Sequence, residues 1–195
     1  MAGAAIERAS SGAVAGRARG VMVGSLIAFG WAVFGSRLFG GAGRYALLAV
    51  GAVVTATLVA AAVALQRRAR ALPAPTAEQA RAGRRAWRLF WLNLVGEIVL
   101  LNIAITLLAA PHLQDFWIPA ISLVVGLHFW PMAVFFRLRS YWWIGAAMIA
   151  GAGVTALLIA QHRDWAFALI HGEAIANAVI LWSALAAGAV AARRL

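Results

Sequence analysis

The sequence contains no cysteine and no lysine, and only six of its 195 residues are acidic. Without cysteine, the chain cannot form a disulfide bond, a thiolate nucleophile or a cysteine metal site. Charged residues make up 12% of the chain and apolar residues make up 64%. Because so few polar side chains could not cover a surface in water, the composition argues against an ordinary soluble domain and predicts that the protein is surrounded by the lipid bilayer.

Several patterns that mark enzymes are also missing. The sequence has no HExxH spacing of a zinc hydrolase and no GxSxG motif around a serine nucleophile. Haem ligation in a helical bundle needs paired histidines, but His112 and His162, two of the four histidines, lie outside the long apolar runs. We therefore predict no catalytic residue, no cofactor and no metal site, with a membrane enzyme or redox protein as the alternative.

Long apolar runs dominate what the sequence does contain. A helix needs about 20 mainly apolar residues to cross a hydrocarbon core of ~30 Å. Six segments meet this length, at residues 21–39, 45–65, 89–110, 116–136, 141–160 and 167–192. The runs are continuous, without the alternation of membrane strands. We predict one all-α integral membrane domain over residues 1–195, built as a bundle of six transmembrane helices.

Arginine accounts for all 17 basic residues and is divided unevenly between the two sides of the predicted bundle. One side holds three, Arg37, Arg44 and Arg163. The other side holds the remaining fourteen, which are Arg8, Arg17, Arg19, Arg67, Arg68, Arg70, Arg81, Arg84, Arg85, Arg88, Arg137, Arg139, Arg193 and Arg194. The positive-inside rule predicts that both termini face the cytoplasm, in a bacterial-type inner membrane. Arginines grouped between apolar runs also argue against nucleic-acid binding.

The longest connection is a basic loop at residues 66–88. Within it, Thr76 precedes Glu78 and Gln79, a pattern typical of a helix start with threonine as the N-cap. We predict a short cytoplasmic amphipathic helix here that leads into the third span. Its arginines are expected to contact anionic lipid headgroups, with an anionic partner protein as the alternative.

Three titratable residues interrupt the predicted spans: Glu97, His128 and Glu173. Each lies nine residues from a charged residue at the edge of its span. At 1.5 Å per residue this distance is about 13–14 Å, which places all three near the middle of a ~30 Å core. Because a charge there costs roughly 2.5–3.5 kcal/mol on insertion scales, such residues are commonly functional.

Polar neighbours accompany both glutamates. Asn93 lies one turn before Glu97, and Asn177 lies one turn after Glu173, so each pair shares a helix face. Asn102 adds an amide to the third span on a different face. A carboxyl in this setting can carry a proton or bind a small cation or polar ligand. The alternative is a structural role, because such groups also hydrogen-bond between helices.

The most distinctive run is His128-Phe129-Trp130-Pro131. Proline in a helix frees a carbonyl group and commonly kinks the helix. We expect the freed carbonyl, the imidazole and the indole N–H of Trp130 to line a small cavity, unless the kink serves packing alone. His171 is predicted near the outer end of the sixth span, where it would line a polar entrance.

The two halves of the sequence also resemble each other. Residues 32–38 resemble 133–138, residues 54–60 resemble 154–160, and the pair Gly96-Glu97 resembles Gly172-Glu173. Three spans per half would give two inverted three-helix repeats, which are common in secondary transporters. Chance similarity between alanine- and valine-rich helices is the alternative.

These features favour a transporter or channel for a small solute or cation that uses the mid-membrane glutamates. Two alternatives stay open: a substrate-binding subunit of a larger membrane complex, and a scaffold or sensor that acts through its basic loop. Glycines spaced along the spans would permit close contact between helices and also a homodimer.

Overall fold

The computed structural model describes residues 10–136 and 138–193, and the predicted topology residues Arg8, Arg137 and Arg194 lie outside them. The described residues form six long helices and no strand: α1 (Ser11–Gly35), α2 (Gly41–Arg70), α3 (Ala77–Leu107), α4 (Trp117–Phe136), α5 (Arg139–Gln161) and α6 (Ala166–Arg193). Short 3-10 turns occupy Ser36–Leu38, Pro111–Phe116 and Arg163–Trp165. The helices give six segments long and apolar enough to cross a membrane, which confirms the all-helical class and fits a multi-pass membrane protein.

The helices extend further than the predicted apolar runs. The side chain of Thr76 accepts a hydrogen bond from the backbone N–H of Gln79, and the side chain of Gln79 accepts one from the N–H of Thr76. This capping box confirms the predicted helix start. There is no separate short helix, however, because α3 continues from Ala77 to Leu107 through alanine, arginine and leucine, all good helix formers. Only residues 71–76 of the predicted loop at 66–88 are non-helical.

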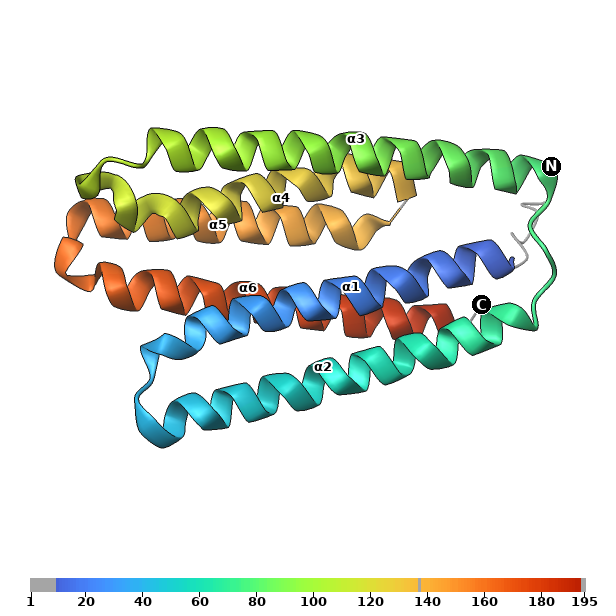
Figure 1. Cartoon of the computed structure of the whole chain (residues 1–195), viewed down its shortest axis with the longest axis horizontal. Helices are drawn as coiled ribbons and strands as arrows, with labels where there is room; N and C mark the ends of the chain where they lie inside the picture. Colours follow the sequence, from blue (N-terminus) through green and yellow to red (C-terminus); the bar gives the residue numbers. More distant parts are fainter. Residues whose placement is uncertain (1–9, 137, 194–195) are drawn as a thin grey trace, which may run out of the picture.

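The six helices form two groups of three (Figure 1). In one group, α1 packs against both α2 and α6; in the other, α4 packs against both α3 and α5. The groups meet where α6 contacts α5 and α4. Helix α3 lies at the edge of the bundle, packs chiefly against α4 and has no buried residue.

Glycine permits the closest helix contacts. A Cβ atom added at Gly145 of α5 would lie 2.6 Å from the carbonyl oxygen of Gly126 of α4. One added at Gly35 of α1 would lie 2.9 Å from the carbonyl oxygen of His171 of α6. Other glycines make no such contact, because a Cβ added at Gly151, Gly153 or Gly188 would meet no atom within 4 Å.

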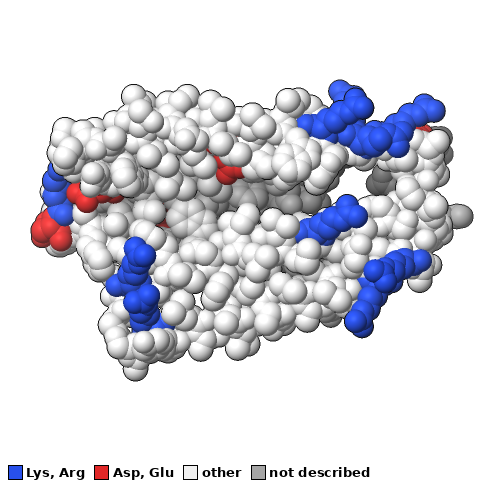
Figure 2. Space-filling model, in the orientation of Figure 1, with Lys and Arg blue, Asp and Glu red and all other residues white. Residues whose placement is uncertain are grey.

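Arginines gather at the two ends of the bundle, and the middle of the face shown in Figure 2 carries none. One end contains the start of α1, the end of α2 and the start of α3, which hold most of the described arginines. The backbone N–H of Ser11 donates to the carbonyl of Pro73 at 3.1 Å and joins α1 to the α2–α3 connection at this end.

Candidate functional site

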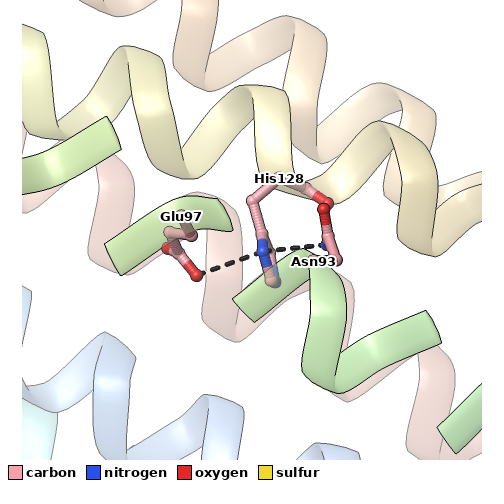
Figure 3. Close-up of polar contacts among 3 residues, drawn as sticks. All are labelled: Asn93, Glu97 and His128. Carbon is pink, nitrogen blue, oxygen red and sulfur yellow. Dashed lines mark hydrogen bonds and ion pairs between the residues drawn. The ribbon is translucent and has the colours of Figure 1, made fainter. Parts of the chain in front are cut away.

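The first polar cluster lies between α3 and α4, where Asn93 and Glu97 face His128 (Figure 3). One carboxyl oxygen of Glu97, Oε2, lies 3.1 Å from His128 Nδ1. The amide nitrogen of Asn93 lies 2.9 Å from the same Nδ1 and donates to the backbone carbonyl of His128 at 3.0 Å. The helical spacing that places Asn93 and Glu97 on one face of α3 therefore directs both side chains at one imidazole.

The cluster leaves one ring nitrogen between two partners with opposite requirements. If Nδ1 carries a proton, it can donate to an ionised Glu97, but it cannot then accept from Asn93. If Nδ1 is bare, it accepts from Asn93, and Glu97 must carry the proton to hydrogen-bond with it. Both arrangements need one proton on the line between Glu97 Oε2 and His128 Nδ1. The geometry is that of a proton-sharing pair.

Aromatic rings and the helices shield this cluster from the surroundings. The side chain of Glu97 is 13% exposed and that of His128 is 10% exposed. The ring of Phe90, one turn before Asn93 on α3, lies edge-on to the His128 ring at a centroid distance of 6.5 Å. In such an apolar setting, hydrogen bonds between charged groups are stronger than in water.

The second polar cluster surrounds Glu173 of α6, which is buried with 6% of its surface exposed. The amide of Asn177, one turn further along α6, donates to the hydroxyl of Ser122 on α4 at 2.7 Å. The hydroxyls of Ser122 and Thr155 lie beside the Glu173 carboxyl, but neither of its oxygens has a hydrogen-bond partner among the described residues. The asparagine is thus used for helix packing, and the carboxyl remains unsatisfied.

Helix α4 lies between the two clusters. It presents His128 to α3 and Ser122 to α6, and these residues are six positions apart on the helix. At 100° and 1.5 Å per residue, they point to well-separated faces and lie about 9 Å apart along the axis. No hydrogen bond or ion pair joins Glu97 to Glu173 in the described part of the chain.

Three predicted site residues lie elsewhere. Asn102 is exposed and donates to the carbonyl of Ile98 on its own helix at 2.8 Å, because its face of α3 points away from α4. Trp130 packs on Gly145 of α5, and its buried indole nitrogen has no hydrogen-bond partner among the described residues. Trp130 thus contacts α5 whereas His128 contacts α3, and α4 runs through Pro131 as a continuous helix.

His171 does not line an entrance, because it is 4% exposed between α1 and α6. Its ring stacks on Phe34 of α1 at a centroid distance of 4.8 Å and lies 4.2 Å from the ring of Phe167. Its Nδ1 lies 2.7 Å from the carbonyl oxygen of Phe167, one turn earlier on α6. These contacts give His171 a packing role.

Two polar contacts were not predicted from the sequence. Thr155 of α5 lies beside Glu173, although single threonines in apolar spans usually bond to their own helix. The indole of Trp182 on α6 donates to Thr55 of α2 at 3.2 Å, and Thr55 in turn donates to the carbonyl of Ser25 on α1 at 3.4 Å. The second contact links the three helices of the first group.

Comparisons with protein-family models, curated proteins and solved structures found no match to this chain. The described residues also contain no group of three or more histidine, aspartate or glutamate side chains that could hold a metal ion. The function must therefore be inferred from the two polar clusters and their positions in the bundle.

Proposed function

We propose that this protein is a proton-coupled transporter of a small solute or cation in a bacterial-type inner membrane. The observation that carries the proposal is the proton-sharing pair of Glu97 and His128 in the middle of long apolar helices. Titratable groups in such positions are costly, and in membrane proteins they commonly form proton relays. A purely structural link would need only one arrangement of protons, whereas Nδ1 of His128 has a different partner in each of two.

The position of α3 supports a link between proton binding and movement. This helix has no buried residue and packs chiefly on α4, and the polar cluster supplies side-chain hydrogen bonds between the two. Moving the proton between Glu97 and His128 changes which of these bonds form. The change alters how strongly α3 is held against α4, which can favour one of two positions of a peripheral helix.

Two of the contacts between helices fit an inverted repeat, whereas the contact of α5 with α6 has no comparable counterpart between α2 and α3 in the described part of the chain. When α1, α2 and α3 are paired with α4, α5 and α6, the contact of α1 with α2 corresponds to that of α4 with α5. The contact of α1 with α6 corresponds in the same way to that of α4 with α3. Each group of helices would then combine two helices of one repeat with the third helix of the other. Inverted repeats of this kind underlie alternating access in many transporters.

The positions of the arginines support a cytoplasmic location of both termini. The end that holds the start of α1 and the α2–α3 connection is the more basic, and basic ends stay on the cytoplasmic side. Arginines at the start of α3 would then lie near anionic headgroups of the inner leaflet.

The test is flux into liposomes under an imposed pH gradient, measured for a panel of inorganic cations and small organic amines. We expect flux that follows the pH gradient and falls on the order of 100-fold in Glu97→Gln, since proton-transfer groups contribute about this much or more. Asn102→Leu is the matched control, because Asn102 lies on the same helix and bonds only to its own backbone among the described residues.

The opposite outcome is also informative. If no solute moves, and Glu97→Gln only lowers the unfolding temperature, the cluster is a structural link between α3 and α4. The proposal is then wrong, and the chain is better explained as a scaffold, a sensor or a substrate-binding subunit.

A further inference from the structure

A groove lies between α5 and α6. It has a volume of about 460 Å³, within the usual range of small-molecule sites. Small residues create the space, which are Ala147, Ala150 and Gly151 of α5 with Ala168, Gly172 and Ala176 of α6. A Cβ added at Gly151 or Gly172 would meet no atom within 4 Å, so the two helices do not close over these glycines.

Glu173 is the one acidic residue that lines the groove, and only 6% of its surface is exposed. The hydroxyls of Ser122 and Thr155 lie beside the carboxyl, but neither of its oxygens has a hydrogen-bond partner among the described residues. No arginine or histidine lines the groove to balance the charge. A buried carboxylate without a partner is costly, so a group that brings a positive charge and N–H donors would offset this cost.

The remaining lining narrows the class of ligand. Apart from Glu173, Asn177 and Thr155, the groove is lined by apolar side chains. A metal ion such as Mg²⁺ or Ca²⁺ needs six or more oxygen ligands, but the groove offers one carboxyl group. An anion would be repelled, and an acyl chain would leave the carboxyl oxygens unsatisfied. An ammonium group with an apolar body matches both parts of the groove.

We infer that the α5–α6 groove binds a primary or secondary organic ammonium ion, whose N–H groups donate to the Glu173 carboxylate and whose apolar part lies along the small residues. As a statement about the transported substrate this inference rests on the proposed function; as a statement about binding it stands alone. Charge-assisted hydrogen bonds of this kind are among the stronger ones in an apolar site.

The experiment measures binding of 2-phenylethylamine to the full chain in lipid nanodiscs by isothermal titration calorimetry, without any flux. Glu173→Gln is expected to weaken binding at least ~10-fold, because the neutral amide cannot pair with the ammonium charge. Gly151→Leu keeps the carboxyl and fills the groove, and it should weaken binding to a similar degree. The uncharged 2-phenylethanol, of nearly the same shape, should bind at least ~10-fold more weakly than the amine.

Two controls separate the groove from the rest of the molecule. Gly188→Leu lies on α6 outside the groove, where an added Cβ also meets nothing within 4 Å, and should bind the amine as the wild type does. Asn102→Leu, at an exposed position of α3, should also bind normally. Circular dichroism of every variant, with an unchanged helical signal, shows that a loss of binding is not a loss of folding.

The inference is overturned if the wild type does not bind the amine, or if Glu173→Gln and Gly151→Leu both bind it unchanged. Equal binding of the alcohol and the amine would also overturn it, because the carboxyl would then play no part. Amine binding without any flux contradicts the proposed function alone. Flux that depends on Glu97 without amine binding contradicts this inference alone.

Discussion

Glu97 and Glu173 have similar neighbours in the sequence, but their carboxyl groups have different surroundings in the structure. Each follows a glycine and lies one turn from an asparagine on a long apolar helix. At Glu97, the asparagine and the carboxyl both face His128, and the cluster is satisfied internally. At Glu173, the asparagine binds Ser122 and the carboxyl has no partner among the described residues. The helix opposite a polar residue therefore determines whether it can share a proton or is left to bind something else.

The largest expected difference between the two clusters concerns transport. His128→Leu removes the proton partner of Glu97 and should reduce flux driven by a pH gradient on the order of 100-fold. Ser122→Ala removes the corresponding neighbour at the second cluster and should leave most of the flux. Liposome flux of both variants is the measurement, and equal losses would mean that the two clusters do not differ in role.

The second prediction compares the closed and the open face of α5. Gly145→Leu forces a side chain into the backbone of Gly126 and should lower the free energy of unfolding by about 3 kcal/mol. The leucine side chain of Gly151→Leu extends into the open groove beside Glu173, so this variant should change the free energy of unfolding by less than ~0.5 kcal/mol. Chemical unfolding in detergent, followed by circular dichroism, checks both. A large loss in Gly151→Leu would show that the groove is closed in the membrane.

The third prediction removes each carboxyl in turn. Glu97→Leu leaves His128 without its carboxyl partner and should lower the free energy of unfolding by about 1–3 kcal/mol. Glu173→Leu removes a buried polar group that makes no hydrogen bond, so stability should stay the same or rise. The same unfolding measurement gives both values, and the reverse order would contradict the contrast between the clusters.

The smallest effect is expected at the asparagines. Asn177→Leu loses the bond to Ser122 that joins α6 to α4, which should cost about 0.6 kcal/mol, the usual value for hydrogen bonds between membrane helices. Asn102→Leu loses only the hydrogen bond to a backbone carbonyl of its own helix and exposes an apolar side chain, so no measurable loss of stability is expected. A thermal unfolding series distinguishes the two, and a larger loss in Asn102→Leu would indicate a contact with another molecule.

The number and approximate limits of the long helices could be predicted from the sequence, because the length of an apolar run and a capping pattern such as Thr76–Gln79 act locally. The hydrogen-bond partner of each polar residue could not be predicted in this way. His128 contacts Glu97 of α3, whereas Trp130, two residues after His128 on the same helix, faces α5. A helix turns about 100° per residue, and packing determines which of its faces meets each neighbour.

The groove between α5 and α6 also could not be predicted from the sequence. Small residues allow two helices to approach closely, as at Gly126 and Gly145, but they equally allow a gap where neighbouring contacts hold the helices apart. Gly145 and Gly151 lie on the same helix six residues apart and show both outcomes. Only the three-dimensional arrangement of α4, α5 and α6 distinguishes them.

The contact between α1 and α6 has a consequence for how the protein is made. These helices come from opposite ends of the chain, and α6 touches α1, α2, α4 and α5. The ribosome makes α1 and α2 before α6, so these two helices lack their third partner until α6 has also been made. The two groups of helices can therefore join into a single bundle only once α6 is present.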